Sequence, residues 1–90
     1  MKIRFLDLCP DKIFLLGYEL KLSPTEEKLL RAIAEGGKSD IDSLALLLTN
    51  GVSRTNISVH ISSINRKAEK ISKRKLVIYK NSRYTVNPYM

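Results

Sequence analysis

The feature that most constrains this chain is a long amphipathic helix predicted over residues 54–72. Apolar residues recur there at spacings of four, three, four and three, namely Ile57, Ile61, Ile64, Ala68 and Ile71. At about 100° per residue, these side chains fall within one narrow stripe of a helix. Because such a helix is stable only when its apolar stripe is buried, the rest of the chain has to supply a surface that covers it.

The N-terminal residues predict a small antiparallel sheet. Ile3 and Phe5 alternate with charged residues, which is typical of a strand with one buried face. A turn at Pro10-Asp11 follows, and residues 13–22 form two short apolar runs folded about Leu16-Gly17. We therefore expect three antiparallel strands before the first helix.

A helix start follows this sheet. Ser23 suits the N-cap, Pro24 the first helical position, and Glu26 completes a capping box three residues after the cap. The predicted helix runs to about Glu35, where Gly36-Gly37 ends it.

A second helix is predicted between this helix and the long one. Ser39 or Asp40 is its cap, its core face is rich in leucine, and it stops at Asn50-Gly51. Only a few residues then separate it from the helix over 54–72, so the pair is a helix-turn-helix candidate.

The end of the chain predicts a β-hairpin. Residues 76–80 and 83–86 are strand-like, and Asn81-Ser82 forms the turn between them. Three strands, three helices and a hairpin make an α+β fold, a winged helix-turn-helix, in which residues 76–86 form the wing. Residues 1–90 fit one domain of this kind.

Positive charge is concentrated in the C-terminal part of the chain. The net charge is +7, yet residues 1–53 hold seven Lys/Arg against eight Asp/Glu. Residues 54–90 hold nine Lys/Arg against Glu69 alone. This distribution is expected of a face that binds a polyanion, although a solvated basic helix is the alternative.

The composition argues against several other classes of protein. Cys9 is the single cysteine, so no disulfide framework of a secreted domain can form, and a cytoplasmic protein is expected. One Cys and one His make no metal site, and no nucleophile–base pair or paired carboxylates indicate an enzyme. Charges interrupt the apolar N-terminal residues, so no membrane span is expected there. We expect no cofactor and no small-molecule ligand.

The face of the long helix opposite its apolar stripe, with the residues flanking that face, carries the candidate binding residues. Its first two turns are short and polar and its last two are cationic, which suits a helix that meets base edges first and phosphates later. The candidates on this helix are Arg54, Thr55, Asn56, Ser58, Val59, His60, Ser62, Ser63, Arg66, Lys67 and Lys70.

Four of these residues are candidates for contact with bases. Val59 lies outside the apolar stripe and suits a thymine methyl group, or equally packing under the hairpin or against a protein. Asn56 has the chemistry to read adenine, but helix capping explains it as well. Ser62 and Ser63 hydrogen-bond several base edges or phosphates, so they predict modest sequence discrimination if they are not simply solvated.

The cations predict contact with phosphates, each adding to the salt dependence of binding. Lys80 and Arg83 flank the hairpin turn, from which they would enter a minor groove, with solvated wing cations as the alternative. His60 lies at the edge of the apolar stripe, where it would donate to a phosphate or have no role.

Two segments resemble a known family, the OmpR/PhoB-type winged-helix effector domains of bacterial response regulators. Residues 22–30 are similar to that family's L-T-P-x-E-x-x-L-L start of the first helix. Residues 56–67 resemble its V-D-V-H-I-x-R-L-R-x-K recognition helix, and Tyr84 falls at its wing tyrosine. The resemblance spans nearly the whole chain and implies a bacterial transcriptional regulator that binds double-stranded DNA.

The resemblance also implies roles for individual residues. Positions near bases or adjacent phosphates fall to Asn56, Val59, Ser62 and Ser63. His60 and Asn65 occupy positions that contact the DNA backbone, and Lys80 that of the wing's minor-groove cation.

The chain departs from the family pattern in three places. Ser58, Ser63 and Asn65 replace the usual Asp, Arg and Arg. The turn at 81–83 replaces a glycine-rich one, and Arg83 stands where a positive φ is expected. The connection before the long helix lacks the longer loop that contacts RNA polymerase in the family, which favours repression or an architectural role. Apart from these three departures, no receiver domain is expected on residues 1–90, so no phosphorylation switch is placed there.

Two other partners are compatible with a basic winged helix. An acidic protein is the main alternative, since its charge would complement the same face. RNA is less favoured, because no exposed aromatic stacking platform is apparent among four Tyr and two Phe. On DNA, a small domain with few strong base readers is expected to bind as a homodimer or a tandem pair.

Overall fold

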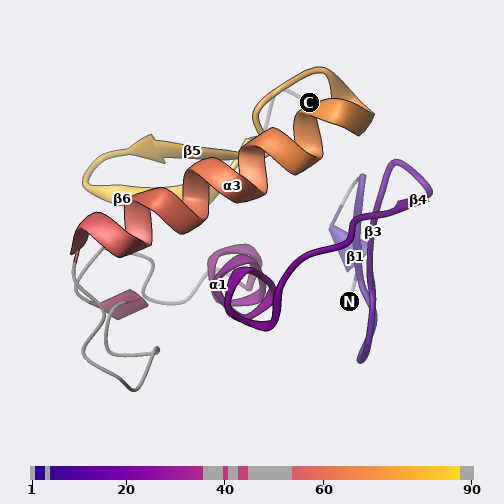
Figure 1. Ribbon diagram of the computed structural model, residues 1–90, viewed down its shortest axis with the longest axis horizontal. Coiled ribbons are helices and arrows are strands. Elements are labelled where there is room, and N and C mark those ends of the chain that lie inside the picture. The colour runs from indigo at the N-terminus through magenta and orange to yellow at the C-terminus, as the bar shows by residue number, and fades with distance from the viewer. Residues whose placement is uncertain (1, 4, 36–39, 41–42, 45–53, 88–90) are drawn as a thin grey trace.

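The computed structural model describes residues 2–3, 5–35, 40, 43–44 and 54–87, with the backbone alone for residues 2–3 and 54–56. Four strands come first: β1 (Lys2–Ile3), β2 (Leu6–Leu8), β3 (Ile13–Leu15) and β4 (Tyr18–Glu19). Helices α1 (Pro24–Ala34) and α3 (Arg54–Ser72) follow, and the hairpin strands are β5 (Val77–Lys80) and β6 (Arg83–Val86). In Figure 1, α3 crosses close to α1, with the hairpin along one side and the N-terminal sheet beyond α1.

The N-terminal sheet is antiparallel throughout, in the order β1-β2-β3-β4. The predicted three-stranded sheet is present as β2, β3 and β4, and a fourth strand extends it. This fourth strand arises because the first predicted strand is divided: Phe5 lies in a turn, and its carbonyl accepts from the Leu16 N–H (2.8 Å). Leu16 (φ 52°) and Gly17 (φ 84°) form the left-handed turn that joins β3 to β4.

Helix α1 begins as the sequence predicts. The Glu26 N–H donates to Ser23 Oγ (3.2 Å), and the Ser23 N–H donates to Glu26 Oε1 (2.8 Å), which completes the capping box. The helix ends at Ala34, with Glu35 as its C-cap. Its buried face is made of Leu29, Leu30 and Ile33.

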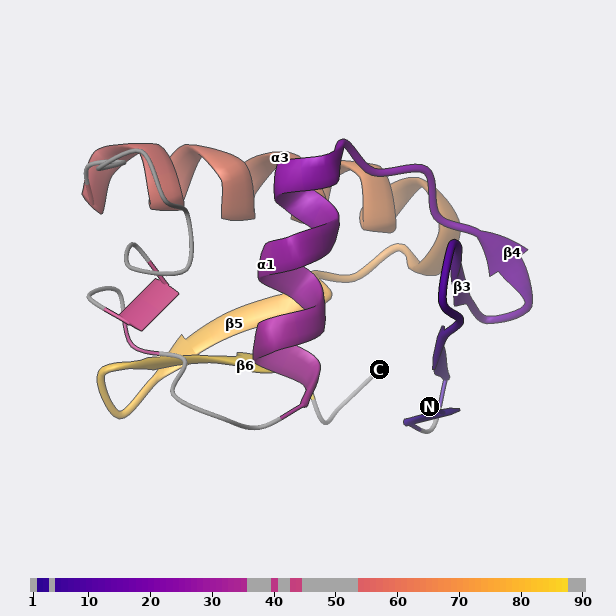
Figure 2. The same cartoon turned by 90° about the horizontal axis from the view of Figure 1, so that it is seen from below.

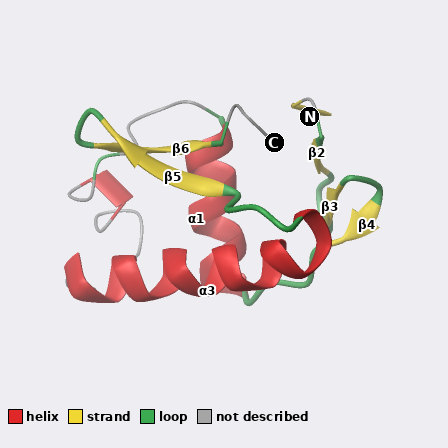
Figure 3. Cartoon of the chain, turned by 90° about the horizontal axis from the view of Figure 1, so that it is seen from above, coloured by secondary structure: helices red, strands yellow, loops and turns green. Residues whose placement is uncertain are grey.

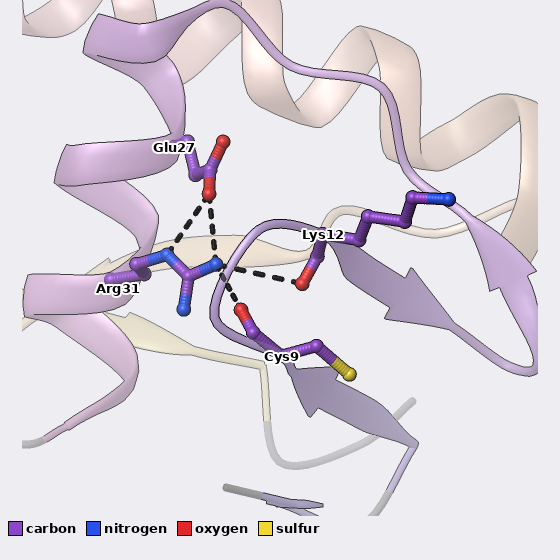
Figure 4. Close-up of polar contacts among 4 residues, drawn as sticks. All are labelled: Cys9, Lys12, Glu27 and Arg31. Atoms are coloured by element: carbon purple, nitrogen blue, oxygen red, sulfur yellow. Dashed lines mark hydrogen bonds and ion pairs between the residues drawn. The ribbon is translucent and has the colours of Figure 1, made fainter.

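An arginine joins α1 to the turn between β2 and β3 (Figure 4). Arg31 forms an ion pair with Glu27 (2.8 Å), one helical turn earlier. The nitrogen of Arg31 that forms this ion pair, Nη2, also donates to the carbonyls of Cys9 and Lys12. Within the turn, the Cys9 N–H donates to the Lys12 carbonyl (2.9 Å). Arg31 thereby attaches the turn between β2 and β3, and with it the N-terminal sheet, to α1.

Most of the predicted second helix lies outside the described residues, as does the connection that follows it. Ser43 and Leu44 are helical, and Leu44 is buried. Asp40 accepts hydrogen bonds from the Ser43 N–H (3.2 Å) and hydroxyl (2.8 Å), which is the geometry of the predicted cap. Two helices, α1 and α3, thus have defined bounds in the described parts of the chain, against three predicted.

Helix α3 and the hairpin have nearly the predicted bounds, and β5 comes closest to α3 where it begins, at Val77 (Figures 1 and 3). Lys73 follows α3 with φ 65°, a left-handed residue that ends the helix. The hairpin turn places Asn81 (φ 53°) and Ser82 (φ 62°) in the left-handed region, as a type I′ turn requires. The expectation of a positive φ at Arg83 is therefore wrong, because the two positive φ values of the turn fall on Asn81 and Ser82.

The core forms where α1, α3, the N-terminal sheet and the hairpin meet. Figure 2 shows α1 extending from α3 at one end to the hairpin at the other. The predicted apolar stripe of α3 is confirmed, since Ile57, Ile61, Ile64 and Ala68 are buried and Ile71 packs against the core. The side chains opposite this stripe are left available for a partner.

Candidate nucleic-acid interface

A buried carboxylate of α1 lies against one flank of α3. Glu26 is 3% exposed, and its Oε1 accepts from Lys67 Nζ at 2.5 Å. Burial raises the pKa of Glu26, but hydrogen bonds from Lys67, Ser63 and the Ser23 N–H outweigh this effect and lower the pKa from 4.5 to about 2. Glu26 is therefore charged at neutral pH and attaches α3 to the start of α1.

This arrangement gives two of the predicted binding residues a different neighbour. Ser63 and Lys67 are half-buried and both hydrogen-bond Glu26. For Lys67 to bind a phosphate, its ammonium group would have to share or leave the ion pair. Sequence reasoning treated Lys67 and Lys70 alike because it did not include α1 as a neighbour.

The opposite flank of α3 is attached to the wing by Asn65. Asn65 Nδ2 donates to the Val77 carbonyl (2.9 Å), and the Val77 N–H donates to Asn65 Oδ1 (2.8 Å). One amide side chain thus satisfies both backbone groups of the first residue of β5. The position that the family resemblance assigns to DNA backbone contact is used here to hold the wing beside the helix.

The outward face of α3 lies between these two flanks. Ser58, Val59, Ser62, Arg66 and Lys70 are exposed there, and 60% of the surface of Val59 is accessible. Neither Arg66 nor Lys70 forms an ion pair with another residue in the described part of the chain. This face thus combines short hydroxyls, one apolar side chain and two cations, as the sequence predicts.

The remaining predicted helix residues divide between two situations. His60 is half-buried at the edge of the core face. Arg54, Thr55 and Asn56 belong to the first turn of α3, and their side chains lie outside the described residues.

The wing carries its two predicted cations at its tip. Lys80 and Arg83 are exposed and stand opposite each other as the last pair before the turn. Arg83 is also close enough to Asp40 to influence it: hydrogen bonds from Ser43 lower the pKa of Asp40, and the charge of Arg83 contributes a smaller part.

A shallow groove of about 280 Å³ runs between α3 and β5, and we call it the helix–wing groove. Ser58 and Ser62 line it from α3, and Lys75 and Tyr79 line it from the segment that leads into and through β5. Two tyrosines are exposed on separate sheets: Tyr79 in this groove (55% exposed) and Tyr18 on the N-terminal sheet (68%). The number of tyrosines in the sequence does not predict which of them is exposed. The position of Tyr79 two residues after Val77 does predict that the two side chains share one face of β5.

Other kinds of site find no support in the described residues. No three His, Cys, Asp or Glu side chains gather there as metal ligands would. Neither described helix combines the length and apolar character needed to cross a membrane.

The N-terminal sheet, helices α1 and α3 and the C-terminal hairpin together define a winged-helix domain. No protein-family model matches the chain, and no curated protein matches it. One solved structure that does match is the DNA-binding domain of the response regulator AdeR, in complex with an intercistronic region, with a TM-score of 0.82. The sequences are 14% identical, and the match covers 96% of each chain. The chain therefore has the fold of an OmpR-family DNA-binding domain, as the sequence resemblance implies.

Proposed function

We propose that this chain binds double-stranded DNA with a sequence preference and acts as a bacterial transcriptional regulator. In this proposal α3 enters the major groove, and the wing over residues 76–86 lies at the adjacent minor groove. The observation that carries it is the outward face of α3, where Arg66 and Lys70 are exposed beside Val59 and two serines. The AdeR domain supports the proposal, because that structure holds the same fold on DNA.

In this proposal, different residues of the outward face contribute to affinity and to sequence discrimination. Arg66 and Lys70 occupy successive turns of α3 and suit contact with phosphates, which supplies affinity for any sequence. Ser58, Val59 and Ser62 lie nearer the start of the helix, where side chains of this size reach base edges. Lys80 and Arg83 at the wing tip suit a narrow minor groove.

The role of the remaining candidates follows from their neighbours. We assign His60 to the edge of the interface and Arg54, Thr55 and Asn56 to its N-terminal end. Ser63 and Lys67 lie on the flank that Glu26 occupies, so we place them behind the contacting surface. Since few strong base readers remain, we expect two copies to bind together on paired half-sites.

A salt titration on duplex DNA tests the proposal. A duplex selected from a random pool is labelled, and its affinity is measured by fluorescence anisotropy at several salt concentrations. Arg66→Ala and Lys70→Ala are each expected to reduce the slope of log K against log salt by about one unit, because each removes one phosphate contact. Lys12→Ala is the matched control, since Lys12 is an exposed cation in the turn between β2 and β3 and not on α3 or the wing.

Two outcomes would contradict the proposal. If no duplex binds even at low salt, the basic face binds something other than DNA, and an acidic protein becomes the better candidate partner. If Lys12→Ala reduces the slope as much as Arg66→Ala does, the attraction is a property of net charge and not of α3.

A further inference from the structure

The helix–wing groove holds an aromatic side chain whose position is fixed by the register of the hairpin. Tyr79 pairs with Tyr84 across the hairpin, and Val77 pairs with Val86. Side chains two residues apart on a strand share a face, so Tyr79 lies on the same face as Val77. Asn65 attaches the backbone of Val77 to α3, and both Val77 and Tyr79 line the groove beside the helix.

The ring of Tyr79 is held in place although it is exposed. It meets the ring of Tyr84 edge to face, with centroids 5.0 Å apart and planes inclined at 66°. Tyr84 is itself 8% exposed and belongs to the core, so the ring of Tyr79 rests on a fixed support. A partner that packs on the free face would find the ring already ordered, which lowers the entropic cost of contact.

The surroundings of the ring match the chemistry of a sugar–phosphate backbone. Buried apolar side chains, Ile61 and Val77, form the floor of the groove. The hydroxyls of Ser58 and Ser62 and the ammonium group of Lys75 line it as well. Apolar surface suits the carbon atoms of deoxyribose, while hydroxyls and one cation suit phosphate oxygens.

The position of the groove agrees with this chemistry. Major and minor grooves of a duplex are separated by one backbone strand, so a strand must pass between a helix in one and a wing in the other. Resting on the DNA-binding function proposed above, we infer that the helix–wing groove receives this strand and that the Tyr79 ring packs against its deoxyribose. Lys75 then neutralises a phosphate of the same strand.

Three substitutions test separately the contributions to DNA affinity of the Tyr79 ring, of its hydroxyl group and of the Lys75 charge. On the selected duplex, Tyr79→Ala is expected to weaken binding by about five- to tenfold at every salt concentration, with the salt slope unchanged, because an apolar contact releases no counterion. Tyr79→Phe keeps the ring and should bind within about twofold of the wild type. Lys75→Met should instead reduce the slope by about one unit.

Tyr18→Ala is the matched control, because Tyr18 is also an exposed strand tyrosine but lies on the N-terminal sheet; the affinity of this variant for the duplex should be unchanged. Tyr79→Thr keeps a residue that favours strands, and it replaces the alanine variant if that variant fails to fold. Wild-type affinity in Tyr79→Ala, or a loss in Tyr79→Phe as large as in Tyr79→Ala, would overturn the inference. Failure of the wild-type protein to bind any duplex would instead remove the proposed function.

Discussion

Replacing Glu26 by glutamine should show how strongly one carboxylate holds α3 on α1. The pKa of Glu26 is about 2 in the folded protein, against an ordinary value of 4.5. At about 1.4 kcal/mol for each pH unit between these values, the charged form contributes roughly 3 kcal/mol to the free energy of unfolding at neutral pH. Glutamine keeps the shape but loses the charge, so Glu26→Gln should cost about 2–3 kcal/mol at pH 7.

The pH dependence of this contribution has a definite sign. Because folding lowers the pKa of Glu26, the stabilisation is fully present above about pH 4.5 and is lost as the pH falls toward 2. The wild-type protein should therefore lose stability across this window, and Glu26→Gln should lose about 3 kcal/mol less over it. The difference between the two proteins should be largest at pH 7 and smallest near pH 2.

Urea unfolding followed by the helical circular dichroism signal measures both quantities. Glu27→Gln is the control: Glu27 forms an ion pair with Arg31 on the same helix, but both side chains are partly exposed, and a cost of about 0.5 kcal/mol is expected. A double-mutant cycle of Glu26→Gln with Lys67→Met should give a coupling of about 1–3 kcal/mol. The reasoning is refuted if Glu26→Gln costs no more than Glu27→Gln, or if its acid dependence is that of the wild type.

Three further substitutions test the ends of α3 and the wing. Ser82→Gly relieves a left-handed serine in the hairpin turn and should raise the free energy of unfolding by about 0.5–1 kcal/mol; a decrease would contradict the turn geometry. Lys73→Gly should stabilise by a similar amount at the residue that ends α3, again measured in urea. Asn65→Ala leaves both backbone groups of Val77 unpaired and should cost about 2–4 kcal/mol, with faster hydrogen exchange at the Val77 amide. Unchanged exchange there would show that Asn65 does not hold the wing.

The elements that the sequence predicts most accurately are those with a local physical signal. The spacing of Ile57, Ile61 and Ile64 predicts α3 with its observed bounds, since one helix face has to be apolar along its whole buried length. Ser23 and Glu26 predict the start of α1, because their hydrogen bonds join residues only three apart. The division of the first strand at Phe5 had no such signal, because its backbone partner is Leu16, in the turn that joins β3 to β4.

The parts of the candidate site that escaped prediction depend on contacts between distant segments. Lys67 and Glu26 are 41 residues apart, and the pattern of α3 alone cannot tell which flank another helix will cover. The sequence therefore predicts the outward face correctly but treats Lys67 as one more phosphate ligand. Asn65 escaped for the same reason, because its partner is a backbone group of β5 and not a side chain with a recognisable pattern.

The paired hydrogen bonds of Asn65 have a consequence for how the wing can vary. They fix β5 at its first residue, ahead of the turn, and so set the register of β5 against α3. A displacement of β5 by one residue would exchange its two faces, so that Tyr79 would take the face that Ile78 and Lys80 now occupy. Because the attachment precedes the turn, residues inserted between Asn81 and Ser82 would lengthen the wing without exchanging the faces of β5. The length of the wing and the identity of its helix-facing residues can therefore change independently.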